Sequence, residues 1–548
     1  MKFEIVDVDA LARLGRISLN GKEMITPNLF PVVHPSRNII PPQNLKKFGA
    51  QCLFTNAYII YKNEKLRAQV LHKGLHEYLN YDGIIATDSG AFQQYMYNKD
   101  SFDLDATTIE RFQEDIGSDF PVILDIPVQL EDSFEVAKEK VNTTIERAKD
   151  NISRRTRQDC YWFGPLHGGT HFELLKESTI EMSKLDFGIY AVGGIVKAFL
   201  NYRFDLTTQI LLTVKRHVIP NKPIHMFGLG LPQYFSLAVA CGCDLMDSAA
   251  YILFAKENRY FTLSTGTRKL EELNEFPCHC PICVKYSPGE LMKFEEDLRI
   301  QLIAKHNLYL SFSELKTIRQ AIREGNLWEL VEQRIRSHPN LVKAASLIKR
   351  NKPLFEVYEK IYKNHGRLYS SKESIERPLI YRYEQKLLNN YRPPKEVKYF
   401  IILPELDVKG KTSPMVIKWL AEIDNNELIK RDQIHLAFYS IIYGIFPYEL
   451  IYSFPMGQCE TSPTYGTNDG SYQNSIETAE KFVDKFSPTY EKCGLLIPDF
   501  YLNQFEELIQ FPENHLIHGL NIILRKAYKS NFSVFSQIKD ILHFFKEK

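Results

Sequence analysis

The stretch "LPQYFSLAVACGCDLMD", residues 231–247, reads as a helix followed at once by a buried strand. Pro232 stands at the start of the helical part and Gly242 at its end, which are the positions that these residues favour. The short apolar run after Gly242 closes on a carboxylate, Asp247. A helix that leads directly into a buried strand is the repeating unit of a parallel sheet, so the stretch predicts an α/β fold.

Eight short apolar runs of this kind lie between residues 30 and 250, and most are followed by a longer helical stretch. They are FPVV (30–33), CLFTNA (52–57), GIIAT (83–87), PVILD (121–125), YWFGP (161–165), IYAVGG (189–194), IHMFG (224–228) and CDLMD (243–247). Eight alternations of strand and helix close a TIM (β/α)8 barrel, which we place at residues 1–270. A doubly wound open sheet is the competing architecture.

Polar residues and glycines stand where these strands end. They are Asp88 in "TDSGAFQ", Asp125 in "ILDIP", His167 in "GPLHGG", Gly193 and Gly194 in "AVGGIV", and Asp247 in "LMDSA". The chemistry of a TIM barrel sits at the carboxyl ends of its strands. One aspartate there is more often a helix N-cap than a catalyst, but three at equivalent positions predict a mouth lined by carboxylates.

The composition is that of an ordinary globular protein, with 44% hydrophobic and 25% charged residues. A net charge of +1 gives no global attraction to nucleic acid. The run from Lys349 to Lys372 interleaves basic and aromatic residues, which suits either a nucleic-acid backbone or a solvated helix face. Acids interrupt the first apolar run and the most apolar stretch, so we expect a cytoplasmic protein with neither a signal peptide nor a membrane span.

Three of the nine cysteines lie within "FPCHCPICVKY", residues 276–286. They cannot all pair with one another, and so few cysteines in a long chain argue against a disulfide framework. The spacing Cys278-x-Cys280-x-x-Cys283 is that of a zinc knuckle, in which thiolates converge on a tetrahedral ion. A redox dithiol is the alternative.

A zinc knuckle needs a fourth ligand. His306 lies 23 residues beyond the last of the three cysteines and is the favoured candidate. His279 would be wedged between two ligands, and Cys241 and Cys243 belong to the last predicted barrel strand. Four protein ligands would leave no position open for water, so the ion would be structural.

Beyond residue 250 the pattern becomes helical. We expect a zinc-binding helical subdomain at 271–365, a linker at 366–395 and a C-terminal α+β region at 396–548. Ser311 and Glu314 have the spacing of a capping box, which predicts that a helix begins at residue 311.

Together these motifs resemble those of the tRNA-guanine transglycosylases, in particular the archaeal, archaeosine-forming branch. The resemblance is close over residues 25 to about 310 and weaker in the C-terminal region, through "PYELIYSFPMGQCE". The segments that carry it are "DSGAFQ", "VILDIPV", "AVGGIV", "FGLGLP", "GCDLMDSAAY" and "CHCPIC" with a histidine beyond it. It implies a TIM barrel with a zinc subdomain that holds one structural Zn²⁺ per chain through Cys278, Cys280, Cys283 and His306.

The resemblance also implies a pentosyltransferase that acts on tRNA. Guanine at position 15 of the D-loop would be exchanged for 7-cyano-7-deazaguanine (preQ0), without ATP and through a covalent ribosyl-enzyme intermediate. Asp247 matches the family nucleophile on the ribose C1′, and Asp88 matches the carboxylate that manages protons, although some accounts of the archaeal branch reverse these roles. One carboxylate must meet the oxocarbenium-like centre while another group handles the proton of the departing base.

The remaining matches concern the base. Asp125 corresponds to the residue that recognises guanine, since a carboxylate can accept from both N1–H and the exocyclic amine. Phe92 and Phe227 fall where the family sandwiches the base, with barrel packing as the alternative reading. The resemblance counts four further positions as substrate-binding: Ser89 in "DSGAFQ", and Ala191, Gly193 and Gly194, which would bring backbone groups to the base edge.

Two features depart from the family. His167 stands where a glutamine usually donates to O6 of guanine, and an imidazole N–H could do the same. The family's C-terminal PUA module is not found after the last helix, "NIILRKAYKSNFSVFSQIKDILHFFKEK". We therefore expect a separately encoded PUA-domain partner, in addition to a homodimer and a C-terminal region that binds tRNA.

Three other functions compete with base exchange. A non-catalytic tRNA-binding subunit would have lost its nucleophile, whereas Asp88 and Asp247 are both present. A related archaeosine-pathway enzyme that acts on the inserted nitrile is expected to lack the intact exchange motifs. An unrelated zinc hydrolase needs an open metal position, which three cysteines and a histidine would not leave.

Overall fold

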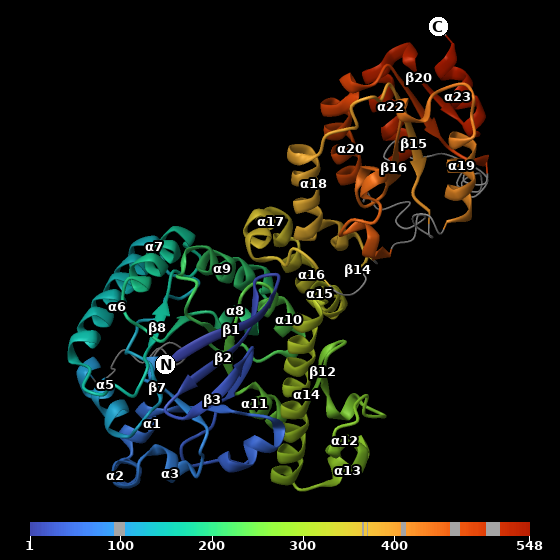
Figure 1. The fold of residues 1–548 in the computed structure, drawn as a ribbon. Helices are drawn as coiled ribbons and strands as arrows, with labels where there is room; N and C mark the ends of the chain where they lie inside the picture. Colours follow the sequence, from blue (N-terminus) through green and yellow to red (C-terminus); the bar gives the residue numbers. More distant parts are fainter. Residues whose placement is uncertain are drawn as a thin grey trace. The chain divides into compact units, whose positions relative to one another are not determined.

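The computed structural model describes residues 1–91, 105–363, 367–369, 371–406, 413–460, 472–499 and 516–547. The chain divides into two units, residues 1–350 and residues 351–548. Figure 1 shows the elements of each.

The first unit is built on eight parallel strands. β4, β11, β10, β9 and β8 form one parallel set in that order, and β5, β6 and β7 form another. Parallel bridges from Val32 to Phe54 and from Val122 to Phe163 join the two sets at both edges, so the sheet closes on itself. The predicted TIM barrel is confirmed, and the open sheet is excluded. The strands are β4 (Asn28–Pro31), β5 (Cys52–Asn56), β6 (Ile84–Asp88), β7 (Phe120–Pro121), β8 (Phe163–Leu166), β9 (Ile189–Val192), β10 (Ile224–Met226) and β11 (Leu245–Ser248).

Helices follow these strands around the outside of the barrel (Figure 1). The Ser133 hydroxyl caps α6 by accepting from the amide of Val136. Pro232 occupies the first turn of α10, as the sequence predicts. The helices are α1 (Ala57–Lys62), α2 (Glu64–Lys73), α3 (Leu75–Leu79), α5 (Ala106–Asp115), α6 (Phe134–Arg154), α7 (Phe172–Ser183), α8 (Val196–Leu200), α9 (Phe204–His217), α10 (Pro232–Ala240) and α11 (Ala250–Lys256).

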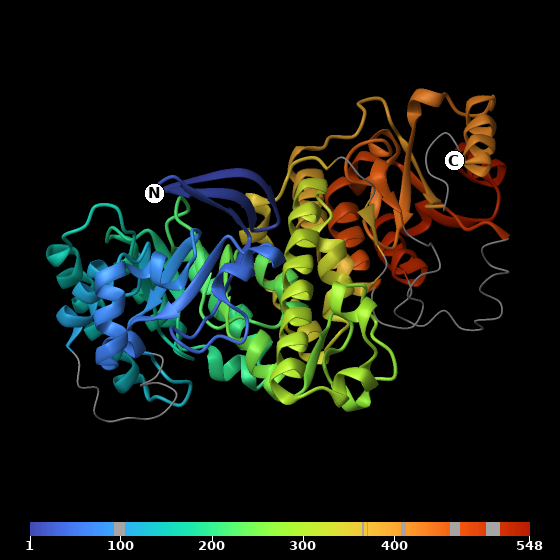
Figure 2. The ribbon, with the colours of Figure 1, turned by 90° about the horizontal axis from the view of Figure 1, so that it is seen from below.

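A small antiparallel sheet covers the amino end of the barrel (Figures 1 and 2). It consists of β1 (Lys2–Asp9), β2 (Ala12–Leu19) and β3 (Lys22–Thr26). Ile17, Leu19 and Met24 of this sheet belong to the same buried cluster as barrel residues such as Phe30 and Phe163. The sheet therefore closes the foot of the barrel and leaves the carboxyl ends of the strands for a cleft.

The remainder of the first unit is mostly helical. It contains β12 (Arg259–Thr262), β13 (Gly266–Lys269), α12 (Pro281–Lys285), α13 (Pro288–Lys293), α14 (Glu296–Glu324), α15 (Leu327–Ile335), α16 (Pro339–Ala345) and the start of α17 (Leu347–Tyr358). The predicted helix start at Ser311 is wrong, because α14 runs through it until Gly325 ends the helix with a φ of 73°. The buried Ser311 hydroxyl donates to the carbonyl of Asn307, and Glu314 accepts two hydrogen bonds from Arg334. Ser311 and Glu314, which have the spacing of a cap, therefore bond to Asn307 and Arg334 and do not cap a helix.

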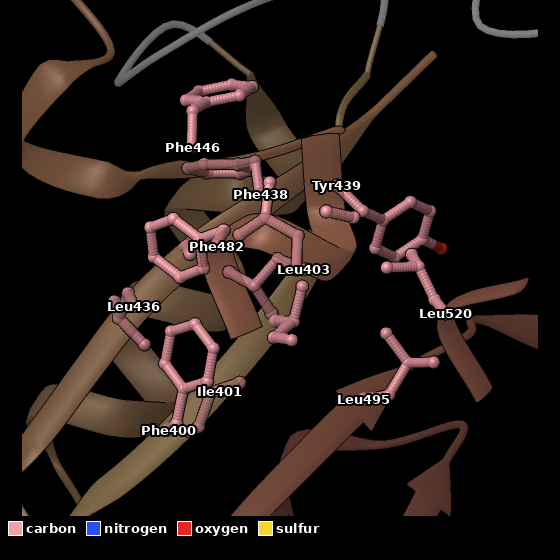
Figure 3. Packing of buried hydrophobic residues seen from close by; sticks show 14 of the residues in the cluster. Phe400, Ile401, Leu403, Leu436, Phe438, Tyr439, Phe446, Phe482, Leu495 and Leu520 are labelled. Carbon is pink, nitrogen blue, oxygen red and sulfur yellow. The ribbon is translucent and has the colours of Figure 1, made fainter. Parts of the chain in front are cut away.

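The second unit has a five-stranded sheet in the order β17-β16-β15-β19-β20, parallel except for the β16–β17 pair. Figure 3 shows part of the core beside it, with Phe400, Phe438 and Phe482 labelled. The ring of Phe400 also stacks on Tyr490 at 4.5 Å between ring centroids. Its elements are β14 (Arg367–Leu368), α18 (Pro378–Asn390), β15 (Tyr399–Pro404), α19 (Pro414–Asp424), β16 (Ile434–Ser440), β17 (Gly444–Pro447), β18 (Cys459–Glu460), α20 (Tyr472–Phe486), β19 (Lys492–Leu496), α22 (Leu516–Tyr528), β20 (Phe532–Phe535) and α23 (Ile538–Lys546).

The division of the chain lies earlier than the sequence suggests. The segment expected as a linker, 366–395, contains α18, whose residues Leu379, Tyr383 and Leu387 belong to the core of the second unit. Arg382 of α18 donates to the backbone carbonyls of Glu356, Glu359 and Lys360. These bonds tie the residues after 350 to the second unit. In the part of the chain that the structure describes, no helix combines the length and apolar character that crossing a membrane requires.

Candidate active site and metal centre

A cleft of about 1330 Å³ opens at the carboxyl ends of the barrel strands. Asp88, Asp125 and Asp247, which follow three different strands, all line it. Phe227, Gly193 and Gly194 line it as well, so the structure brings six of the predicted site residues together. Phe92 lies outside the described residues.

Asp88 ends β6 and is held by its neighbours. The Asn56 amide donates to Oδ2 of Asp88 at 2.7 Å, and the backbone N–H of Gly90 donates to Oδ1 at 3.2 Å. Asn56 is the register partner of Asp88 on β5, and its own Oδ1 caps α1. Asn56 was not among the predicted site residues; its signal is its place at the end of the apolar run "CLFTN", on the strand beside that of Asp88.

Asp125 is 6% exposed and accepts a hydrogen bond at Oδ2 from Nε2 of His167, at 2.6 Å. Its Oδ1 accepts none from the described residues. His167 is itself 1% exposed and does not line the cleft. His167 therefore donates its Nε2 N–H to Asp125 from beneath the cleft surface, and its direct contact with the base stays a prediction.

Close packing explains the two glycines beside this pair. A Cβ on Gly193 would lie 2.3 Å from Cε1 of His167. A Cβ on Gly194, which has a φ of +73°, would lie 2.4 Å from the carbonyl oxygen of Val128. Either contact is too short for a side chain, so both positions require glycine whether or not a base approaches.

Two predicted contact residues lie deeper. Ala191 is fully buried in the barrel core, and the hydroxyl of Ser89, also fully buried, donates to the carbonyl of Ile123 at 3.0 Å. Neither residue lines the cleft. The bond from Ser89 joins the end of β6 to the segment before Asp125, so Ser89 supports the mouth from below.

Asp247 lies on β11 and has a partner that the sequence analysis missed. Nε2 of His225 lies 2.8 Å from Oδ1 of Asp247, and the backbone N–H of Gly228 donates to the same oxygen at 3.1 Å. His225 is fully buried on β10, opposite Leu245 and two residues along from the level of Asp247. The one available signal was a lone histidine in the apolar run "IHMFG".

The rim of the cleft carries His34, Arg37 and Lys256 together with Glu296 and Asp297. Nδ1 of His34 accepts from the backbone N–H groups of Ser36 and Arg37 at 3.1 Å each. Burial, and then the neighbouring cations Arg37 and Lys256, lower the pKa of His34. The rim is therefore mixed in charge.

Four basic residues form ion pairs within the chain, two in the segment 153–158 and two in the run from Lys349 to Lys372. The pairs are Arg154 with Glu110, Arg157 with Asp159, Lys352 with Glu376, and Lys363 with Glu359. Part of the positive charge of these segments is therefore compensated within the chain.

The four predicted metal ligands converge. The ligand atoms of Cys278, Cys280, Cys283 and His306 all lie within 4.8 Å of one another. Nδ1 of His306 lies 3.5 Å from Sγ of Cys280 and 3.4 Å from Sγ of Cys283, so this nitrogen faces the thiols. His279 is exposed, whereas Cys241 and Cys243 are buried in the barrel, and none of the three belongs to the cluster.

Neighbouring groups orient these ligands. Nε2 of His306 donates to the carbonyl of Phe261 at 3.0 Å, which leaves Nδ1 free to bind a metal ion. The Tyr260 ring stacks on His306 at 3.6 Å between centroids, and the Tyr260 hydroxyl lies 3.3 Å from Sγ of Cys283. Three thiolates and one imidazole are a donor set that suits a tetrahedral ion, so these residues can hold a metal.

Comparison with known proteins agrees with the site. Residues 7–340 match the family described as queuine tRNA-ribosyltransferase. The tRNA-guanine(15) transglycosylase of Methanocaldococcus jannaschii is 35% identical over 519 residues, which cover 92% of this chain and 75% of that protein. The enzyme of the same name from Methanococcus vannielii is 41% identical over 91% of this chain and 77% of its own length, and that of Pyrococcus furiosus is 40% identical over 70% and 65%. The closed barrel, the carboxylates at its mouth and these matches place the chain in the queuine tRNA-ribosyltransferase family of pentosyltransferases.

Proposed function

We propose that this enzyme exchanges guanine at position 15 of tRNA for 7-cyano-7-deazaguanine. The observation that carries the proposal is the cleft in which Asp88, Asp125 and Asp247 meet at the barrel mouth. Family membership supports transfer of a ribosyl group, and the relatives' name, tRNA-guanine(15) transglycosylase, supports the nucleoside. The nitrile-bearing base is the substrate that the motif resemblance implies.

In the proposed reaction Asp247 is the nucleophile. A free carboxylate oxygen attacks C1′ as the bond from C1′ to N9 of guanine breaks, which gives a ribosyl ester of Asp247. The departing guanine takes up a proton that Asp88 delivers directly or through water. The incoming base then gives its N9 proton to Asp88, N9 attacks C1′, and the ester bond to Asp247 breaks, which restores both carboxyl groups.

We propose that Asp125 selects the base. Its Oδ1 accepts no hydrogen bond from the described residues, and the carboxylate can accept from N1–H and the exocyclic amine of a guanine-like base. His167 holds the other oxygen from below. Phe227, which lines the cleft, offers one flat side of the base pocket.

We propose that the metal ion is Zn²⁺ with a structural role. Cys278, Cys280, Cys283 and His306 would supply four ligands, which leaves no position for water or substrate. Bound zinc would stabilise the segment that joins β13 to α14. The homodimer and the tRNA-binding role of the C-terminal region stay predictions.

The test is exchange of radiolabelled guanine into unmodified archaeal tRNA. We expect incorporation by the purified chain, and release of the label when 7-cyano-7-deazaguanine is added. The matched control is Asp247→Asn, which should bind tRNA but exchange nothing. Failure of the wild-type chain to incorporate label, at tRNA concentrations where a gel shift shows binding, would contradict the proposal.

A further inference from the structure

We propose that His225 is a positioning residue that selects which oxygen of Asp247 attacks, an inference that rests on the exchange activity proposed above. Both donors to Asp247, His225 and the Gly228 amide, bind Oδ1. Oδ2 accepts no hydrogen bond from the described residues, and the side chain lines the cleft. The carboxylate is therefore held by one oxygen and offers the other.

The surroundings of His225 are unusual for a polar ring. It is fully buried and lies among the rings of Phe30, Phe54, Phe163 and Phe227, with centroid distances of 5.8, 6.1, 5.1 and 5.0 Å. An imidazole in an apolar cage is unfavourable unless its polar atoms are bonded. Nδ1 of His225 has no hydrogen-bond partner among the described residues, so the hydrogen bond to Asp247 is the interaction that compensates the burial of the ring.

A phenylalanine would fill this cage without any such cost. Packing alone therefore does not account for a histidine at position 225, whereas its contact with Asp247 does. An ionised carboxylate can only accept, so Nε2 must carry the proton in this bond. His225 is therefore the donor and Asp247 the acceptor of this hydrogen bond.

Strand geometry sets the direction of the contact. Side chains two residues apart in a strand share a face, and His225 is in register with Leu245 of the neighbouring strand. Asp247 is two residues beyond Leu245, so its Cβ leaves the strand on the side where the imidazole lies. The two side chains meet diagonally across neighbouring strands, with the Gly228 amide as the second donor.

Asp88 provides the contrast. Each of its two oxygens already accepts a hydrogen bond, from Asn56 and from Gly90. A carboxylate held at both oxygens suits proton transfer through its partners, whereas attack on carbon needs an open oxygen. This difference assigns the nucleophile to Asp247 and its attacking atom to Oδ2.

The test compares His225→Phe with His225→Gln. The phenylalanine variant keeps the cage filled and removes the donor, whereas the glutamine amide nitrogen reaches about as far as Nε2 of histidine. The main readout is the rate at which the protein forms a covalent adduct with tRNA in a single turnover without free base, resolved on a denaturing gel. Tm, the Kd for tRNA and the KM for guanine are measured in parallel.

We expect His225→Phe to slow adduct formation and kcat by about 10–100-fold, with Kd, KM and Tm within twofold or a few degrees of wild type. His225→Gln should recover most of the rate. A wild-type adduct rate in His225→Phe would overturn the inference. So would a glutamine variant as slow as the phenylalanine variant when both are folded, or a loss of Tm with a normal rate per folded molecule, since either would mean a structural role. A wild-type chain that neither forms the adduct nor exchanges guanine would refute the proposed function instead.

Discussion

An aspartate lies near each end of strand β11, and the two differ in how their carboxylate oxygens are hydrogen-bonded. Asp244, just before the strand at the foot of the barrel, is fully buried and accepts from the Arg13 guanidinium at both oxygens and from the Ile224 amide at 2.7 Å. Asp247, at the mouth, receives both of its hydrogen bonds at one oxygen. The two aspartates are three positions apart in the sequence, yet Asp244 accepts at both oxygens whereas Oδ2 of Asp247 accepts no hydrogen bond from the described residues.

The difference shows how a barrel separates stability from chemistry. At the foot, the ion pair between Arg13 and Asp244 fastens β2 to the barrel, and no atom remains for a substrate. At the mouth, His225 and the Gly228 amide donate to one oxygen of Asp247 and so orient its carboxylate. The metal centre resembles the foot, because its four ligand atoms converge on one another and not on a cleft. Substitutions should therefore separate into those that abolish exchange and those that unfold the protein.

The largest expected effect is at the mouth. Asp247→Asn should lower kcat for guanine exchange by roughly 10³-fold or more, because an amide is a poor nucleophile. Tm and the Kd for tRNA should stay close to wild type, since the amide oxygen can still accept from His225 and Gly228. Exchange assays, thermal unfolding and gel shifts measure these three quantities. A variant that keeps more than a tenth of the activity would remove Asp247 from the role of nucleophile.

The same aspartate-to-asparagine change at the foot should lower the stability and leave the exchange rate unchanged. Asp244→Asn leaves the buried Arg13 without its charged partner, which costs about 3–5 kcal/mol of unfolding free energy. Urea titration followed by circular dichroism measures this loss. The exchange rate per folded molecule, assayed at low temperature, should stay within about twofold of wild type by the barrel argument. Normal stability, or a rate that falls as far as in Asp247→Asn, would break the comparison.

The metal centre should behave like the foot. Cys280→Ser removes one thiolate, and because metal binding and folding are coupled we expect a loss of about 3 kcal/mol together with the bound metal. Elemental analysis and chemical unfolding measure the two effects. His279→Ala is the matched control, since His279 is exposed and outside the cluster. Stoichiometric metal in a His306→Ala variant would show that the fourth ligand lies elsewhere.

Much of the barrel and of the metal centre can be predicted from local sequence. Each barrel strand is buried on both faces and so reads as a continuous apolar run, and the carboxylates stand where those runs end. The metal ligands are equally visible, because three of them lie within six residues. These features depend on spacing along the chain, which a sequence shows directly.

What the sequence does not show depends on pairing between distant segments. His225 meets Asp247, and His167 meets Asp125, only because neighbouring strands align at a particular register. Ser311 has the spacing of a cap but lies within α14, where the surrounding structure buries it. The sheet β1–β3 also went unpredicted, because it stands outside the strand–helix repeat.

A smaller effect is expected for base selection. Asp125→Ala should raise the KM for free guanine by roughly 30-fold, or about 2 kcal/mol, because the base donors lose their acceptor. The discrimination against adenine should weaken with it. His167→Gln, which keeps a donor beneath Asp125, is the control and should stay within about fivefold of wild type. Unchanged selectivity in Asp125→Ala would assign base recognition to another group.

The smallest effect returns to the foot of the barrel and depends on pH. Lys215 on α9 is 5% exposed, and burial, with a further contribution from Arg13, lowers the pKa of its ammonium group to about 7, against the pull of Asp244. The unfolded chain holds this proton up to a pH of about 10.5, so between pH 7 and 10.5 unfolding takes up a proton. The titration of Lys215 should therefore make the unfolding free energy of the wild-type protein increase with pH between pH 7 and 10.5. Lys215→Met keeps the apolar stem against Gly242 and removes the charge, so we expect a higher unfolding free energy than wild type at pH 7 and a difference that shrinks toward pH 10. Unfolding free energies at pH 7, 8.5 and 10 for both proteins test this, and parallel curves would show that Lys215 does not titrate in the folded barrel.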